Sequence, residues 1–214
     1  MKLGILGGTF NPIHLGHLRV AEEIGEELKL KKVYLIPTGI PPHKEQYPIA
    51  EFPHRLEMTK LASKISSILD VWDIEGKRSG LSYSIETLKA FHSYFGSTLE
   101  LFFIIGMDAF IDIKTWKEYQ NLFDFASFVV INRPGYNKER FSEFLDSLNI
   151  GVRRDEKNQC FCHPSGNVLL NKNTTFMDIS ATRIRELVAK KKSIRFLVPE
   201  VVREYIEKVG LYLN

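Results

Sequence analysis

Short apolar segments alternate with longer amphipathic segments along most of the chain. Each short segment is rich in β-branched or aromatic residues and is bounded by turn residues, a pattern that indicates a strand. The predicted strands are residues 3–6, 33–36, 69–74, 99–105 and 128–131. Strands that alternate with helices in this way are typical of βαβ units, whose strands run parallel.

The amphipathic segments place apolar residues three or four positions apart, which is the spacing of one helix face. The predicted helices are residues 15–28, 53–65, 84–95, 138–148, 179–189 and 199–209. The last has proline at its expected first position and Gly210 just past its end, the usual start and stop signals. We therefore predict an α/β fold, a Rossmann-like doubly wound sheet of mainly parallel strands with flanking helices.

The position of the central strand also follows from the pattern. Residues 99–105 form the most apolar stretch, as expected for a mid-sheet strand covered by helices on both faces. Residues 150–175 are polar and predict irregular structure, apart from Val168-Leu169-Leu170. A length of 214 residues fits a single domain over residues 1–214, with a small helical C-terminal part at about 179–214.

Composition narrows the function classes. Apolar residues make up 44% and charged residues 26% of the chain, which excludes a disordered or fibrous class. The net charge of +3 is too small to indicate a nucleic-acid or membrane partner, and it suits a small anionic substrate. The apolar run at the start is short and broken by Gly4, unlike a signal peptide or a membrane span. We therefore expect a cytoplasmic protein.

The two cysteines stand close together, in Cys160-Phe161-Cys162-His163. In the cytoplasm both thiols would stay reduced, and we favour free cysteines near a loop. The alternative is that the two thiols and His163 are three ligands of a metal site. No second ligand pair with finger-like spacing accompanies them, so we predict no protein metal site.

A glycine-rich stretch follows the first predicted strand directly and leads into a helix. It reads Gly7-Gly8-Thr9-Phe10-Asn11-Pro12-Ile13-His14-Leu15-Gly16-His17. Paired glycines let backbone N–H groups approach an anion closely, and the helix end adds unpaired donors with a favourable dipole. The stretch matches neither the P-loop pattern nor the dinucleotide-binding pattern. We expect it to hold an oxyanion by another arrangement.

His14 and His17 are three residues apart at the helix start, so they project from nearly the same face. One interpretation is a cap histidine and a core histidine without function. We favour a functional pair, because both stand beside Gly-Gly-Thr. Imidazole can donate an N–H bond to a phosphate oxygen whether it is neutral or protonated.

These residues carry a resemblance to a known family. The stretch resembles the long form of the His-x-Gly-His signature of the nucleotidylyltransferase superfamily, and more closely that of the bacterial nicotinate-nucleotide adenylyltransferases. Further motifs of that family match in order along the chain. They are Pro41-Pro42-His43-Lys44, Ser82-Tyr83-Ser84, Gly106-Met107-Asp108, Trp116, Arg133-Pro134-Gly135-Tyr136 and Ile179-Ser180-Ala181-Thr182-Arg183-Ile184-Arg185.

The resemblance implies that the protein joins ATP and nicotinate mononucleotide, giving deamido-NAD and pyrophosphate in NAD biosynthesis, with Mg²⁺ carried on the phosphates. It implies a catalytic set of His14, His17, Lys44 and Arg185. The implied ATP site comprises Gly7, Gly8, Thr9, Phe10, His14, His17, Gly106, Asp108, Arg133, Ile179, Ser180 and Arg185. The implied mononucleotide site comprises Gly8, Thr9, Lys44, Ser84, Trp116 and Lys117.

Such chemistry suits these residue types. The attacking mononucleotide phosphate is already anionic at pH 7, so no strong general base is required. Aligning two anions and neutralising charge on the triphosphate are the main demands. By resemblance, His17 contacts the α-phosphate in the transition state and His14 contacts the neighbouring phosphates. Asp108 is either a helix cap or an acceptor for ribose hydroxyls, and Arg133 could also be an exposed turn residue.

The motif around Ser180 opens a predicted helix. Ser180 is the natural N-cap, and Arg185 stands on the second turn. The segment is either a capped surface helix or, as the resemblance implies, an anion site for the β and γ phosphates. Arg183 is expected to face solvent.

Trp116 lies outside the main apolar segments. Most tryptophans are core residues, but an indole face also attracts a flat cation such as the pyridine ring of the mononucleotide. The family pattern places backbone amides near Ser84 and Lys117 around the ring carboxylate. A carboxylate accepts from both amides, whereas a carboxamide leaves one bond unmade. We therefore predict that the substrate is the acid, nicotinate mononucleotide, and not the amide.

Two departures from the family pattern and several alternatives remain. Asn11 stands where aspartate is common, which removes a charge, and Ser84 stands where threonine is common. Transfer to nicotinamide mononucleotide or another phosphate acceptor is one alternative, and a non-catalytic nucleotide-sensing module is another. We expect ATP and nicotinate mononucleotide as partners, neither nucleic acid nor membrane, and leave a homo-oligomer open.

Replacing Trp116 with alanine should weaken mononucleotide binding roughly tenfold and ATP binding much less, because the stacking surface for the pyridine ring is lost. Titration of each substrate against the variant checks this. An equal loss for both ligands, or no loss for either, would show that Trp116 does not hold the ring.

Overall fold

The computed structural model describes residues 1–42, 49–96, 98–132 and 138–213. The chain forms two compact units. Unit 1 comprises Met1–Leu6 and Tyr83–Phe176, and unit 2 comprises Gly7–Ser82 and Met177–Asn214. The chain therefore passes between the units at the start of the glycine-rich stretch. The expectation of a single domain stays a prediction.

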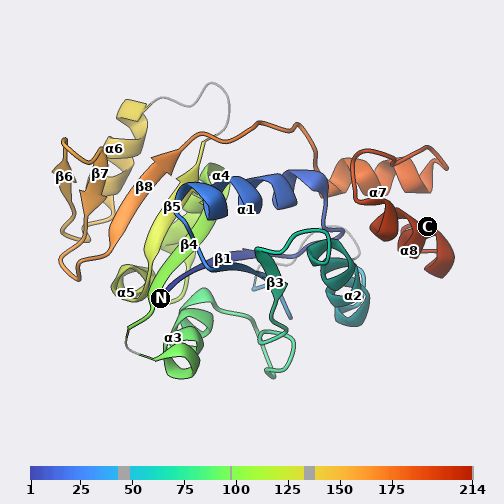
Figure 1. The fold of residues 1–214 in the computed structure, drawn as a ribbon, viewed down its shortest axis with the longest axis horizontal. Helices are drawn as coiled ribbons and strands as arrows, with labels where there is room; N and C mark the ends of the chain where they lie inside the picture. Colours follow the sequence, from blue (N-terminus) through green and yellow to red (C-terminus); the bar gives the residue numbers. More distant parts are fainter. Residues whose placement is uncertain (43–48, 97, 133–137, 214) are drawn as a thin grey trace. The chain divides into compact units, whose positions relative to one another are not determined.

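Unit 1 is built on a mainly parallel sheet. In spatial order its strands are β1 (Lys2–Gly8), β4 (Glu100–Gly106), β5 (Ser127–Ile131), β8 (Val168–Lys172), β7 (Cys160–Cys162) and β6 (Arg153–Asp155). The first four pair in parallel, and β7 and β6 follow as an antiparallel hairpin beside β8 (Figure 1). Phe103 lies opposite both Ile5 and Phe128, so β4 is a central strand as predicted.

The helices of unit 1 cover the buried strands. They are α3 (Ser84–Phe95), α4 (Met107–Ile111), the 3₁₀ helix η1 (Asp112–Thr115), α5 (Tyr119–Phe125) and α6 (Lys138–Ser147). The buried face of α3 presents Ile85, Leu88 and Phe91, at the helical spacing that predicted it. Phe123 of α5 packs against Phe128 of β5, with 4.6 Å between the ring centroids. These contacts form the apolar core of the unit.

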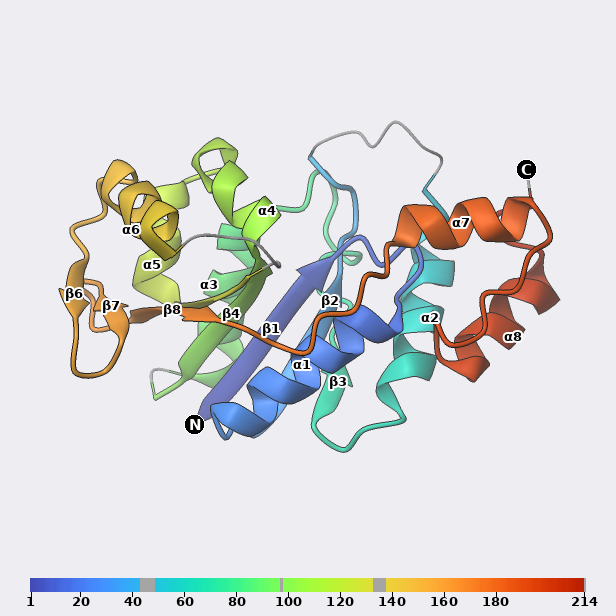
Figure 2. The ribbon, with the colours of Figure 1, turned by 90° about the horizontal axis from the view of Figure 1, so that it is seen from above.

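Unit 2 combines helices with two parallel strands. Its elements are α1 (Leu15–Glu27), β2 (Lys32–Pro37), α2 (Phe52–Ser63), β3 (Leu69–Val71), α7 (Ala181–Ala189) and α8 (Glu200–Val209). β2 pairs in parallel with β3, and α2 contacts both strands and α8 (Figure 2). Gly210 ends α8 with a φ of 74°, a left-handed conformation that favours glycine.

Every predicted strand and helix is present, and the α/β fold class is confirmed. The prediction of irregular structure for residues 150–175 is wrong where the segment holds β6 and β7. The excepted run Val168-Leu169-Leu170 forms the first part of β8. β8 pairs with the fully buried β5, and β7 pairs with β8. Pairing within the sheet therefore stabilises strands in a segment whose own composition does not predict them, since strand formation depends strongly on context. No described helix has the length and apolar character to span a membrane.

Candidate functional site

The glycine loop, residues 7–17, connects β1 to α1. An added Cβ at Gly7 would meet no atom of the described residues within 4 Å, whereas at Gly8 it would lie 2.9 Å from the ring of Phe10. Gly7 therefore leaves open space for an incoming group, and Gly8 makes room for Phe10. Phe10 is buried with a φ of 47°, a conformation that costs a non-glycine residue about 1 kcal/mol.

The imidazoles of His14 and His17 stack on each other at the start of α1. Their centroids are 3.6 Å apart and their planes differ by 20°. The backbone N–H of His14 donates to Nδ1 of His17 at 3.3 Å. Because Nδ1 accepts this bond, a neutral His17 carries its proton on Nε2. His17 is thus set up as a hydrogen-bond donor through Nε2.

Burial determines the charge of both rings. It lowers the pKa of His14 from 6.5 to about 4. Burial, and then the neighbouring His14, also lower the pKa of His17 well below 6.5. Both imidazoles are therefore neutral at pH 7, and they can act on an anion by donating hydrogen bonds.

His14 has a buried polar atom that a ligand could satisfy. Its Nδ1 has no hydrogen-bond partner among the described residues. An added Cβ at Gly16 would lie 3.2 Å from this atom, so glycine at that position keeps the ring in place. A buried polar atom without a partner costs free energy, which a bound acceptor recovers.

The start of α7 brings a cation to the glycine loop. Ser180 caps the helix as predicted, because its Oγ accepts from the N–H of Arg183 at 3.2 Å. Arg185 donates from Nη1 to the carbonyl oxygen of Asn11 at 2.8 Å and from Nη2 to Oγ1 of Thr182 at 3.2 Å. Arg183 is exposed and pairs with Glu186, as expected. The predicted phosphate residues of both motifs thus lie together in unit 2.

Tyr212 and Arg55 also hold the glycine loop, and neither was predicted from the sequence. Oδ1 of Asn11 accepts from the N–H of Ala50 and from the hydroxyl of Tyr212, each at 3.0 Å. Burial raises the pKa of Tyr212, so its hydroxyl stays protonated. Arg55 of α2 donates to the carbonyl oxygen of Thr9 at 2.7 Å. In the sequence, Arg55 stands out only as a charged residue inside a predicted amphipathic helix.

In unit 1, three predicted mononucleotide residues lie close together. Ser84 begins α3, and Trp116 follows η1, half-buried, with its ring edge-on to Phe103 at 6.2 Å. Nζ of Lys117 lies 2.8 Å from Oε1 of Glu86 and 4.5 Å from the ring centroid of Tyr83. The hydrogen bond to Glu86 raises the pKa of Lys117. The segment after η1 is thereby fixed beside the N-terminus of α3.

The remaining predicted residues fall in different places. Gly106 ends β4 and caps α4, and Asp108 is exposed in the first turn of that helix. Ile179 precedes the cap of α7 in unit 2. Lys44 and Arg133 lie outside the described residues.

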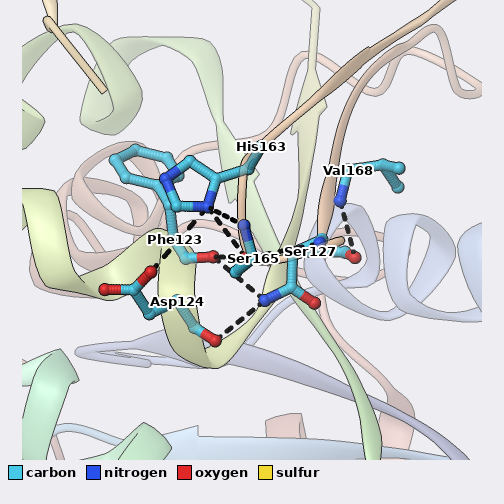
Figure 3. Close-up of polar contacts among 7 residues, drawn as sticks. Phe123, Asp124, Ser127, His163, Ser165 and Val168 are labelled. Carbon is cyan, nitrogen blue, oxygen red and sulfur yellow. Dashed lines mark hydrogen bonds and ion pairs between the residues drawn. The ribbon is translucent and has the colours of Figure 1, made fainter. Parts of the chain in front are cut away.

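His163 does not join the cysteines. Its Nδ1 lies 2.8 Å from Oγ of Ser165 and 3.9 Å from Oδ1 of Asp124, and its ring packs near Phe123 (Figure 3). Oγ of Ser165 also donates to the carbonyl oxygen of Phe123 at 3.1 Å. These contacts attach the turn between β7 and β8 to the end of α5. The proposed trio of two thiols and His163 is therefore not assembled.

Asp155, and not His163, lies near the two thiols. Its carboxylate and the thiols of Cys160 and Cys162 offer ligand atoms within 4.8 Å of one another, and both thiols are free. Within residues 1–42, 49–96, 98–132 and 138–213, this is the one group of three or more potential metal ligands. Two sulfur ligands suit a soft cation, not Mg²⁺. The cluster lies on β6 and β7, outside the glycine loop.

Comparisons with known proteins show which family the chain belongs to. The model of the cytidylyltransferase-like family matches residues 5–187. A protein of Desulfatibacillum aliphaticivorans named "Probable nicotinate-nucleotide adenylyltransferase" is 44% identical over 100% of both chains. A protein of the same name from Geotalea uraniireducens (strain Rf4) is 40% identical over 99% of this chain and 98% of its own.

A solved structure shows the same fold. Plasmodium falciparum nicotinic acid mononucleotide adenylyltransferase complexed with NaAD superposes with a TM-score of 0.75 at 20% identity, over 99% of this chain and 97% of that chain. The chain therefore belongs to the cytidylyltransferase-like family and, within it, to the nicotinate-nucleotide adenylyltransferases.

The lowered pKa of His14 predicts a pH-dependent stability. Between pH 6.5 and about 4 the unfolded chain protonates His14 and the folded chain does not, so stability falls as pH decreases through this window. From pH 7 to pH 5 this residue should account for roughly 2 kcal/mol of lost stability. Urea unfolding of the wild type and of His14→Gln at both pH values checks this. Identical losses in the two proteins would contradict it.

Proposed function

We propose that this chain transfers the adenylyl group of ATP to nicotinate mononucleotide, forming deamido-NAD and pyrophosphate. The stacked, neutral pair of His14 and His17, on the same loop as a Gly7 that no described residue crowds, is the observation that carries this proposal. The names of the relatives and the NaAD bound to the Plasmodium falciparum enzyme support the same reaction.

The residues of unit 2 supply what the triphosphate needs. The amides of the glycine loop and of the α1 N-terminus point their partial positive charge at an anion. Nε2–H of His17 donates to the α-phosphate, where charge develops as the new bond forms. The neutral ring of His14 donates to a neighbouring phosphate. Arg185, already against the loop, adds a full positive charge for the leaving pyrophosphate.

No protein base takes part in this scheme. The mononucleotide phosphate is an anion at pH 7 and attacks the α-phosphorus directly, so pyrophosphate leaves as the P–O bond to it breaks. Neutral imidazoles with a low pKa fit donation better than proton abstraction. Catalysis then rests on alignment and on preorganised donors. Lys44 and Arg133 complete the set by resemblance alone.

We assign the pyridine carboxylate to unit 1. The N-terminus of α3 begins at Ser84, and the backbone amide of Lys117 follows Trp116. The side-chain charge of Lys117 is paired with Glu86, so the donors are the helix N-terminus and backbone amides, which favour a carboxylate over a neutral carboxamide. The indole of Trp116 offers a face to the positively charged ring. This chemistry favours nicotinate mononucleotide over nicotinamide mononucleotide.

Mg²⁺ enters this proposal with the substrate. It would neutralise charge on the triphosphate, and phosphate oxygens are the ligands that it prefers. The described residues around the glycine loop contribute N–H donors to the phosphates instead.

Replacing His17 with alanine should lower kcat by about 100-fold to 1,000-fold, as expected for the loss of one transition-state donor, with little change in KM for ATP. Pyrophosphate release with ATP and Mg²⁺ measures this. His92→Ala is the matched control, because His92 contacts the carbonyl oxygen of Phe125 far along the sequence from the glycine loop.

The same assay, run on the wild type with several acceptors, tests the proposed substrate. Nicotinate mononucleotide should give the highest kcat/KM. Faster turnover of nicotinamide mononucleotide or phosphopantetheine would assign another acceptor. No pyrophosphate release with any acceptor would favour a nucleotide-sensing module without catalysis.

A further inference from the structure

Arg55 is a buried cation in the first turns of α2, with 2% of its surface exposed. Burying a guanidinium group costs several kcal/mol unless its N–H donors find acceptors. A folded chain keeps such a group only where the surrounding acceptors are arranged around it. The identity of these acceptors therefore indicates what Arg55 organises.

Among the described residues, Arg55 donates to backbone carbonyl oxygens from three segments of unit 2. Nη1 donates to Thr9 and Thr38, each at 2.7 Å, Nη2 donates to Gly39 at 3.0 Å, and Nε donates to Ala50 at 2.9 Å. Thr9 belongs to the glycine loop. Thr38 and Gly39 follow β2, and Ala50 precedes α2. One planar, fork-shaped side chain thus joins all three segments, which a point charge could not do.

The contact with Thr9 sets the direction of a donor in the glycine loop. In a trans peptide the C=O of one residue and the N–H of the next point in opposite directions. With its carbonyl oxygen bound to Arg55, Thr9 directs the N–H of Phe10 away from the guanidinium. The loop thereby presents an N–H donor, and not a carbonyl oxygen, on the side away from α2.

Other contacts fix two of these peptides, Thr38–Gly39 and Gly39–Ile40, from their opposite sides, and a further contact holds Ala50. Oγ of Ser82 accepts from the N–H groups of Gly39 and Ile40, at 3.1 Å and 3.2 Å. Oδ1 of Asn11 accepts from the N–H of Ala50. The residues before and after segment 40–49 are therefore both tied to the glycine loop through Arg55 and Asn11.

We infer that Arg55 is a positioning residue for the phosphates of ATP, an inference that rests on the proposed function. It draws the carbonyl oxygens of Thr9, Thr38 and Gly39 toward its own charge, because oxygen dipoles facing a polyphosphate would repel it. It aims the N–H of Phe10 outward and adds positive potential beneath the loop. Arg55 touches no reacting atom and acts through the backbone.

Chemical rescue separates this role from a purely structural one. Arg55→Ala should lower kcat/KM for ATP about 100-fold, the equivalent of one or two charged hydrogen bonds. Guanidinium ion at low millimolar concentration should restore roughly tenfold of that loss, because it refills the site with the same donors. Methylammonium, a cation without the fork, should not. Arg55→Lys, which keeps the charge, should lose about tenfold.

Arg203 provides the matched control. It is a partly covered arginine on α8 that pairs with the side chains of Glu200 and Glu207. Arg203→Ala should leave kcat/KM for ATP within about twofold of the wild type and show no response to guanidinium. Thermal melts of every variant establish that the compared proteins are folded.

Calorimetric titration with a non-hydrolysable ATP analogue gives a readout independent of turnover. Arg55→Lys should raise its Kd about tenfold, whereas Arg203→Lys should not. If the wild type binds the analogue but releases no pyrophosphate from ATP, the proposed function is refuted. The ratio of Kd between Arg55→Lys and the wild type then still tests the role of Arg55 in binding.

Either of two results would overturn the inference. The first is a folded Arg55→Lys variant with wild-type Kd and kcat/KM for ATP. The second is an Arg55→Ala variant whose defect is not relieved by guanidinium and is matched by that of Arg203→Ala. Should Arg55→Ala fail to fold, the lysine variant alone decides.

Discussion

The start of α1 depends on the burial of two imidazole rings stacked on each other. Burial lowers the pKa of His14 and His17, and it makes both rings neutral at pH 7. The bond from the His14 N–H to Nδ1 of His17 then leaves the proton of His17 on Nε2. An imidazolium pair so close together would repel itself, so neutrality is also a condition of the stacked geometry.

A site built from neutral donors requires that acceptors be kept away from the anion. The structure meets this requirement with side chains from distant parts of the sequence. Arg55 and Arg185 bind the carbonyl oxygens of Thr9 and Asn11, and Tyr212 donates to the side chain of Asn11. The conformation of the glycine loop is therefore a property of the folded unit 2 and not of the loop sequence alone. Asparagine at position 11 suits this role, since an amide oxygen accepts both bonds without placing a negative charge beside the phosphates.

The sequence predicted β1 to β5, the longer helices and the glycine loop, because these elements have strong local signals. Short apolar runs between helical segments identified β4 and β5. The glycine loop was identified because its glycines and histidines stand within eleven residues, at Gly7, Gly8, His14 and His17. The hairpin of β6 and β7 was missed, because its stability comes from pairing with β8.

The contacts around the site could not be predicted, because they join residues that are far apart in the chain. Tyr212 is 201 positions from Asn11, and Arg55 is 46 positions from Thr9. No local pattern encodes such partners. The contact of His163 with Asp124 has the same origin, since it depends on where α5 ends.

A crystal structure with a non-hydrolysable ATP analogue would show whether the glycine loop holds the triphosphate. We expect the triphosphate to lie against the loop, with Nε2 of His17 within about 3 Å of an α-phosphate oxygen, a normal hydrogen-bond distance. The N–H of Phe10 should also face the phosphates. A nucleotide bound elsewhere, with the loop empty and the two imidazoles turned away from it, would contradict the account.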